Sequence, residues 1–470
     1  MDKEKVQKKD EGMHPWVILI VIMLLAAVVS YFMPSGVYER VVTPEGTTVV
    51  DPSTFQLVTE NNLSLTSLMT AIPRGIAESI SVVVITFMIG GAFGIIKKTG
   101  MLNLGVKGLV KTFENSKISI IFVLTAVFAL ITGFIGVPEL ALIYIPVLMP
   151  LFFSLGFDSI VTVAISLTGT AAGFGAAWSA PATVGLGHML SDLPMYSGMG
   201  FRFLTAGLLA ISSATYIALY ARKILKNPEA SLVYEEDILH RKEVAAEMDS
   251  QEESTYPRVK LAGLVTVILF LGLILGVIFL SWSFAEMSGY FILLGIIPGL
   301  LAGMSLNEVL DAFVEGLKEM LVGAFIIGIA RGIAVVLNDA MVMDTIIMYL
   351  ARIVVVLPSQ IASLGIFIVT TLFNAIIASG SGKAVIALPI MIPLADITEV
   401  TRQTTILAYQ LGDGITNILW PASGYFMAAL AIGKLSYKKW MKWFFPLLII
   451  WLVIAGVVLL IANSIGYGPF

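Results

Sequence analysis

A polar, glycine-rich segment interrupts a long apolar run in the last third of the chain. Residues 373–393 read FNAIIASGSGKAVIALPIMIP, with Ser379 to Lys383 at the centre. Each apolar arm is about half of the roughly 20 residues that a helix needs to cross a bilayer. Glycine costs about 1 kcal/mol relative to alanine inside a helix, and free backbone groups at membrane depth are tolerated only where they line a protein cavity. The segment therefore predicts a re-entrant hairpin whose tip meets a ligand; the alternative is an ordinary loop between two buried helices.

The composition places the chain in a membrane. Hydrophobic residues make up 58% and charged residues only 13%, whereas a soluble domain carries about 25% charged residues. The chain has no cysteine, which excludes disulfides, thiolate metal sites and cysteine nucleophiles, and its three histidines are scattered. We therefore expect no enzyme and no metal site other than one for a coupling sodium ion. The basic residues lie in short loops as topology demands, so no nucleic-acid partner is expected.

Charge sets the expected topology. Lysines precede the first apolar run, which places the N-terminus in the cytoplasm, and about nine full spans leave the C-terminus outside a bacterial-type cytoplasmic (inner) membrane. The expected segments are a cytoplasmic N-terminus (1–14), a first span (15–33), an extracytoplasmic β-hairpin loop (34–66), a first repeat (67–222), a cytoplasmic linker (223–258), two connecting spans (259–304), a second repeat (305–442) and a last span (443–470).

The two repeats have the same internal order. The first predicts a re-entrant hairpin over 118–157 and a broken span over 158–182; the second predicts a hairpin over 361–396 and a broken span over 403–433. Identical residues recur in register: Gly75, Glu78, Ile85 and Gly91 align with Gly316, Glu319, Ile326 and Gly332, and the hairpins share a spaced proline pair. The segment after the aligned span is lysine-rich in the first repeat and acidic in the second, which predicts inverted topology.

Ionisable and helix-breaking residues at membrane depth indicate the site. Glycine, threonine, asparagine and proline in the broken spans favour half-helix ends, which present N–H groups to anions and C=O groups to cations. Asp413 costs some 2.5–3.5 kcal/mol on insertion scales, which favours a cation ligand or proton carrier; the alternative is a half-helix cap or a pair with a neighbouring donor. Glu139 and Lys383 lie at the hairpin tips, or else reach the interface, and Arg331 is expected to pair with Glu78 or Glu319.

The candidate site draws on both hairpin tips and both broken spans. The expected substrate-binding residues are Gly136, Val137, Pro138, Glu139, Thr170, Trp178, Ser179, Ser379, Gly380, Ser381, Gly382, Lys383, Asp413, Thr416 and Asn417. The expected ligands of a coupling Na⁺ or H⁺ are Gly136, Gly169, Ser379, Asp413 and Asn417, and no catalytic residue is expected. Trp178 and Trp420 are expected to stack on the pocket; the alternative is that they serve helix packing or anchor the membrane interface.

Two motif groups carry a family resemblance over nearly the whole chain. Gly-Ser-Gly-Lys-Ala with Pro-Ile-Met-Ile-Pro, then Gly-Asp-Gly-Ile-Thr-Asn with Trp-Pro, resemble the YfcC/DcuC-type group of the ion-transporter superfamily, as does Gly-Val-Pro-Glu-Leu with Gly-Thr-Ala-Ala-Gly-Phe-Gly-Ala-Ala-Trp-Ser-Ala-Pro in the first half. The resemblance implies an elevator-type secondary transporter, a homodimer in the lipid bilayer with a fixed scaffold and a mobile domain that holds both hairpins. Members of the group are labelled as C4-dicarboxylate carriers or as basic amino-acid exchangers.

The sequence thus predicts an all-α polytopic membrane protein with two re-entrant hairpins in inverted repeats. Its expected substrate is a small carboxylate-bearing metabolite. Glu139 and Asp413 supply negative charge, which favours a basic amino acid, while Lys383 is the one obvious intramembrane cation near a tip. A C4-dicarboxylate carrier is the alternative. An intramembrane enzyme is a distant alternative because no nucleophile–base pair or metal cluster is evident. A channel is also distant, because broken helices in inverted repeats fit alternating access better than a continuous pore.

Overall fold

The computed structural model describes residues 14–43, 48–58, 63–113, 115–249, 256–280 and 282–468, and most of them are helical. The helices are α1 (Pro15–Phe32), α2 (Leu65–Glu78), α3 (Ile80–Lys98), α4 (Met101–Phe113), α5 (Ser119–Ile135), α6 (Ala141–Ser154), α7 (Ser159–Gly175), α8 (Leu186–Leu190), α9 (Met199–Lys226), α10 (Tyr234–Asp249), α11 (Val259–Leu280), α12 (Phe284–Ala302), α13 (Leu306–Asp339), α14 (Met343–Val355), α15 (Ser359–Asn374), α16 (Gly380–Ile397), α17 (Arg402–Thr416), α18 (Gly424–Ile432) and α19 (Tyr437–Ser464). Short helical turns lie at η1 (Pro138–Leu140), η2 (Pro181–Gly185) and η3 (Pro228–Ala230).

The protein is a multi-pass membrane protein. Within the described ranges, eight helices are long and apolar enough to cross a membrane: α1, α3, α9, α11, α12, α13, α16 and α19. Seven of them fall on full spans expected from the sequence. The other two expected spans, 158–182 and 403–433, are each interrupted: in the first the helix α7 ends at Gly175, and the second is divided into α17 and α18. The eighth helix, α16, belongs to the second expected hairpin.

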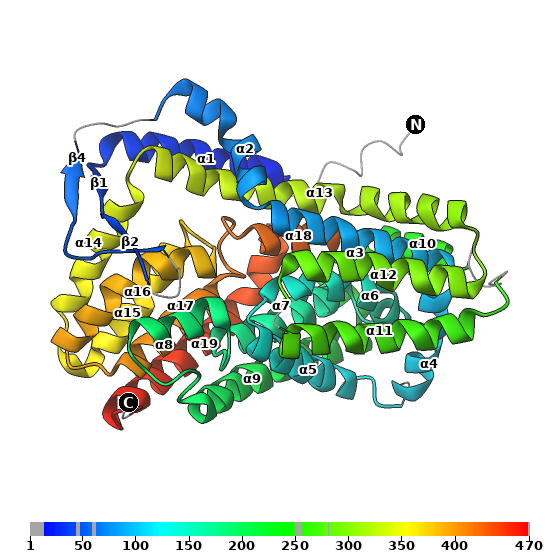
Figure 1. Cartoon of the computed structure of the whole chain (residues 1–470). Coiled ribbons are helices and arrows are strands. Elements are labelled where there is room, and N and C mark those ends of the chain that lie inside the picture. Colours follow the sequence, from blue (N-terminus) through cyan, green and yellow to red (C-terminus); the bar gives the residue numbers. More distant parts are fainter. Residues whose placement is uncertain are drawn as a thin grey trace, which may run out of the picture.

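The loop after α1 carries four short strands: β1 (Ser35–Val37), β2 (Arg40–Val42), β3 (Thr48–Val50) and β4 (Gln56–Val58). β1 pairs with β4 and β2 with β3, both antiparallel, and residues 44–47 between β2 and β3 lie outside the described residues. Arg40 donates two hydrogen bonds of 2.9 Å to the carboxylate of Asp344 on α14, which ties the loop to the second half of the chain. The strands, α14 and the end of α19 lie at one end of the molecule, and α4 and α10 at the other (Figure 1).

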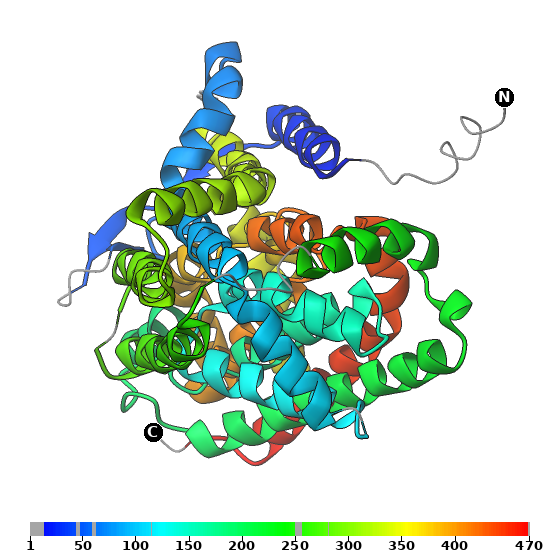
Figure 2. The ribbon, with the colours of Figure 1, turned by 90° about the vertical axis from the view of Figure 1, so that its right-hand side faces the viewer.

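α13 packs along α2 and α3 through close glycine contacts. A Cβ placed on Gly75 would lie 2.6 Å from the Gly332 backbone N, and one on Gly316 would lie 3.1 Å from the Gly91 Cα. The alignment of the two halves pairs Gly75 with Gly316 and Gly91 with Gly332, so exchanging the halves turns one contact into the other. Figure 2 shows α1, α2 and α13 along one side of the remaining helices. We call α1, α2, α3, α11, α12 and α13 the outer group.

α5 with α6, and α15 with α16, form two helical hairpins. The outer ends of the first lie together, since the Lys117 ammonium donates a 3.0 Å hydrogen bond to the Leu155 carbonyl. Both outer ends of the second lie against the end of α19, because Asn463 donates to the Ser359 carbonyl at 2.9 Å and the Thr401 hydroxyl donates to the Tyr467 carbonyl at 2.7 Å. We call α5 to α8 and α15 to α18 the hairpin group; insertion of the hairpins from opposite membrane faces stays a prediction.

The helix breaks differ from those expected at the glycines of the broken spans. α7 stays helical through Gly169 to Gly175, and α17 through Gly412 to Thr416. These glycines serve close packing: a Cβ on Gly169 would lie 3.3 Å from the Thr125 carbonyl O of α5. Each break instead lies just before or around a proline, at 176–180 and 417–423, because a proline ring disfavours helical geometry in the preceding residue.

The linker helix α10 is docked on the helix ends, where the sequence indicated a solvated linker. The Ser159 backbone N–H donates a 2.7 Å hydrogen bond to the Asp237 carboxylate, and the Arg241 guanidinium donates to the Phe157 carbonyl. Ion pairs join Glu236 to Lys439 and Glu243 to Lys434. α10 therefore connects the turn between α6 and α7 to the junction of α18 and α19.

Candidate substrate and ion site

Both hairpin tips open on one cavity of ≈ 400 Å³ between the two helix groups. The hairpin group contributes Glu139 from the first tip and Ser379, Ser381 and Gly382 from the second. The outer group contributes Ser79, Ser81, Phe284 and Arg331, and the start of α18 contributes Gly424 and Tyr425. Such a volume lies within the range of small-molecule sites, and its polar lining comes from segments far apart in sequence.

The SGSGK segment is mostly helical, contrary to the flexible centre inferred from its composition. α16 begins at Gly380 with Ser379 as its N-cap: the Gly382 N–H donates to the Ser379 hydroxyl at 3.2 Å, and the Lys383 N–H to the Ser379 carbonyl at 2.8 Å. The hairpin break lies earlier, at residues 375–379. A serine N-cap offsets the low helix propensity of glycine because it satisfies N–H groups that the first turn leaves free.

Two helix N-termini therefore face the cavity, from α16 and from α18. The first backbone N–H groups of a helix, together with its dipole, favour a bound anion such as a carboxylate. Gly382 at the α16 start and Gly424 at the α18 start line the cavity directly. The hairpin group alone therefore supplies backbone donors for one bound carboxylate in the cavity.

The charged side chains of the cavity are two carboxylates and one guanidinium. Arg331 Nε donates to Glu78 at 3.0 Å, which is one of the two pairings expected for Arg331. Glu139 lies on η1, is half-buried and forms no ion pair with a described lysine or arginine. An unpaired carboxylate in a partly dry cavity favours a cationic group of a ligand.

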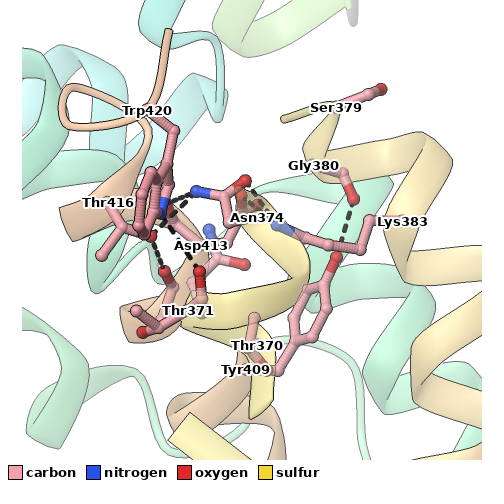
Figure 3. Close-up of polar contacts among 12 residues, drawn as sticks. Thr370, Thr371, Asn374, Ser379, Gly380, Lys383, Tyr409, Asp413, Thr416 and Trp420 are labelled. Carbon is pink, nitrogen blue, oxygen red and sulfur yellow. Dashed lines mark hydrogen bonds and ion pairs between the residues drawn. The ribbon is translucent and has the colours of Figure 1, made fainter. Parts of the chain in front are cut away.

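A fully buried ion pair lies directly behind the second tip. The Lys383 ammonium donates to Asp413 Oδ1 at 2.8 Å and to Asn374 Oδ1 at 2.7 Å, and both charged side chains have 0% exposure (Figure 3). The Asn374 amide donates in turn to the Asp413 carbonyl at 3.0 Å and to the Thr416 hydroxyl at 2.9 Å. In Figure 3 Ser379 points away from this network, so the tip presents Ser379 to the cavity and Lys383 to the interior.

The Asp413 carboxylate also touches the start of α16. A Cβ on Gly380 would lie 2.7 Å from Asp413 Oδ2, and the Tyr409 hydroxyl donates a 2.8 Å hydrogen bond to the Gly380 carbonyl. Within the described residues no well-formed hydrogen bond reaches Oδ2, although Asn417 lies beside it. Asp413 thus pairs with the Lys383 ammonium, which is the alternative that the sequence left open. The pair lies at the tip of the second hairpin.

The two divided spans cross just before their breaks. The Gln410 side-chain amide of α17 donates a 2.6 Å hydrogen bond to the Phe174 carbonyl near the end of α7. This bond satisfies one of the carbonyls that the end of a helix leaves free. The crossing places the α7 break and the Asp413 network side by side.

Of the sixteen expected site residues, Glu139, Ser379, Ser381 and Gly382 line the cavity, and Gly169, Thr170, Trp178 and Ser179 are among those that do not. Gly169 packs on α5, and the Thr170 hydroxyl bonds to the Ser166 carbonyl within α7. Trp178 is buried against Phe134 and Phe203, and the Ser179 hydroxyl donates to the Phe134 carbonyl at 2.9 Å. These residues hold the α7 break against the back of the first hairpin. Trp420 donates through Nε1 to the Thr371 carbonyl at 3.2 Å and fastens the second break to α15.

The other expected residues fall into two places. Gly136 adopts a φ of +73° as the C-cap of α5, and Val137 and Pro138 lead directly into the turn that carries Glu139. Thr416 and Asn417 lie with Asp413 at the end of α17. Sequence reasoning missed Asn374, Tyr409 and Tyr425. Asn374 had a usable signal, since it is a lone amide in an apolar hairpin arm.

A family model and one named relative both indicate transport. Residues 14–464 match the family model described as DcuC, C4-dicarboxylate anaerobic carrier. The chain is 28% identical to the "Putative basic amino acid antiporter YfcC" of Escherichia coli (strain K12), over 96% of each chain, and 28% identical to an uncharacterized protein of Haemophilus influenzae, over 99% of each.

Two solved transporter structures are also similar to this chain. The Alcanivorax borkumensis YdaH transporter is 18% identical, with a TM-score of 0.43 over 97% of this chain and 99% of the other. Neisseria gonorrhoeae MtrF, described with a class of antimetabolite efflux pumps, is 17% identical, with a TM-score of 0.41 over 95% of this chain and 94% of the other.

Proposed function

Because the chain belongs to the C4-dicarboxylate anaerobic carrier family, we propose that it is a secondary active transporter, and that its substrate is a basic amino acid of the arginine or ornithine kind. The observation that carries the choice of substrate is the unpaired Glu139 carboxylate in the same cavity as the α16 and α18 N-termini. A basic amino acid has one carboxylate and two cationic groups, so it matches both kinds of partner.

Each part of such a substrate has a complementary group. Its carboxylate would accept hydrogen bonds from backbone N–H groups at Ser381 or Gly424, which line the cavity, and a cationic group would pair with Glu139. The name of the Escherichia coli relative, a basic amino-acid antiporter, agrees with this assignment. Exchange of one basic amino acid for another needs no net charge movement.

A C4-dicarboxylate is the second candidate, and the family description favours it. Arg331 is the observation in its support, because its guanidinium lines the cavity and could leave Glu78 to pair with a second substrate carboxylate. Glu139 weighs against this candidate, since a carboxylate beside a dianion is repulsive unless it takes up a proton.

We further propose that the hairpin group moves relative to the outer group during transport, as an elevator-type mechanism requires. The cavity has one wall from each group, so such a movement would carry the hairpin tips past Ser79 and Arg331. A homodimer and a cytoplasmic-membrane location with the N-terminus inside remain predictions from the sequence.

Thermal unfolding of the purified protein tests the substrate, because a ligand that binds only the folded state raises the melting temperature. We expect arginine or ornithine to raise it, and Glu139→Gln to abolish the rise. Glu235→Gln on the exposed face of α10 is the matched control and should respond as the wild type does. A rise with succinate or fumarate that needs Arg331 would establish the carrier alternative, and a response to none of these ligands would reject both.

A further inference from the structure

The cation beside Asp413 is part of the chain. We infer that the Lys383 ammonium stands where a coupling sodium ion would bind, so that transport by this protein is independent of sodium at Asp413. The inference rests on the proposed transport function and deepens it, since it names how the charge at the hairpin tip is balanced.

The contacts of Lys383 are those of a bound cation. Its Nζ lies 2.7 Å from Asn374 Oδ1 and 2.8 Å from Asp413 Oδ1, and on a further side faces the Tyr409 ring at 5.9 Å from the centroid. Carboxylate and amide oxygens are hard ligands that also suit alkali and alkaline-earth ions. The ammonium occupies the space between the two oxygens, and a metal ion could not share it.

Charge balance argues against a second cation in this place. Asp413 carries one negative charge and Lys383 one positive charge, and both are fully buried. A sodium ion beside the pair would add an unbalanced positive charge in a low-dielectric interior, where such a charge is costly to bury.

The same geometry predicts what removing the ammonium would do. Lys383→Ala would leave Asp413 as an uncompensated buried carboxylate next to Asn374 Oδ1. Asp413 Oδ2 and Asn417 Oδ1, which have no well-formed hydrogen bond within the described residues, would be further oxygens nearby. A sodium ion could then restore the balance that the lysine normally provides.

The test compares thermal unfolding in sodium chloride and in equimolar choline chloride, without substrate. We expect the wild-type melting temperature to agree in the two salts within about 1 °C. We expect Lys383→Ala to melt lower than the wild type in choline and to recover by about 2 °C or more in sodium. Lys318→Ala removes an exposed lysine on α13 and serves as the matched control, with no sodium response.

Each result has a defined meaning. A sodium-specific rise in the wild type, or uptake into proteoliposomes that needs sodium, would overturn the inference. If folded Lys383→Ala protein has the same melting temperature in both salts, the Lys383 ammonium does not occupy a sodium site. If Lys383→Ala does not fold, Lys383→Met takes the same test, because it keeps the length of the side chain without its charge. The readout needs no substrate, so a failure of the amino-acid proposal leaves it intact.

Discussion

Gly414 of α17 lies directly against Gly175 of α7, so that a Cβ on Gly414 would be 2.2 Å from the Gly175 Cα. The contact joins the ends of the two divided helices at backbone distance. Asp413, the neighbour of Gly414, is thereby held beside the α7 break, and the charge pair lies next to both breaks.

The Gly414 contact leaves no room for a methyl group. Gly414→Ala should lower stability by about 1–3 kcal/mol, as overpacking of a dense core does, and should reduce transport because the two helices must separate. Gly207→Ala on α9 is the control, since a Cβ there meets nothing within 4 Å and alanine favours the helix by up to about 1 kcal/mol. Melting temperatures of the purified variants check both. Equal melting temperatures for the two variants would contradict the close contact.

The Lys383–Asp413 pair should behave as one unit. Asp413→Asn alone leaves a buried ammonium unpaired and should cost about 3–5 kcal/mol, whereas Lys383→Met combined with Asp413→Asn removes both charges and should recover most of that loss. A double-mutant cycle of unfolding free energies measures this coupling. If the effects of the two substitutions on the unfolding free energy are additive, Lys383 and Asp413 do not form an ion pair.

Asp237 should make stability depend on pH at the docked linker helix. Burial raises the pKa of Asp237 to about 6, against the opposing hydrogen bond from the Ser159 N–H. The native state therefore holds the proton more tightly than the unfolded chain, so this group lowers stability as pH rises from about 4 to about 6, by roughly 3 kcal/mol, and adds no further change above that.

Asp237→Asn tests that dependence, since an amide oxygen still accepts from Ser159 but does not titrate. The variant should melt with the wild type near pH 4 and several degrees higher above pH 6. Taking the difference between the two proteins at each pH removes the titration of distant groups. A difference that does not change with pH would rule out Asp237 as the titrating group.

Movement of the hairpin group should change the wall of the cavity. Ser81 of α3 and Ser381 of α16 line the cavity from the two groups, and the chain has no native cysteine. Ser81→Cys with Ser381→Cys should be linked by a short bifunctional thiol reagent, and the link should stop transport. Saturating arginine should alter the yield of the link relative to the single-cysteine controls. A yield that does not respond to any transported substrate would contradict the movement.

Local pattern was sufficient for the long uninterrupted spans. Apolar runs of sufficient length determine helices such as α1 and α19 almost wholly by themselves, because in a membrane the backbone must satisfy its own hydrogen bonds. The charge pair of Arg331 with Glu78 was also readable, since it depends on residue type at a given depth.

The tertiary structure decided which polar groups meet. Lys383 and Asp413 are 30 residues apart, and nothing in the sequence pairs the one with the other. Only the packing of α16 on α17 turns the Lys383 ammonium toward Asp413, while Ser379 faces the cavity. Packing likewise kept Gly169 and Gly412 helical, because each allows a neighbouring helix to approach rather than freeing its own backbone. Hydropathy records the cost of placing a charged side chain in the membrane. Which side chain becomes its partner depends on which helices cross, and that is a property of the whole fold.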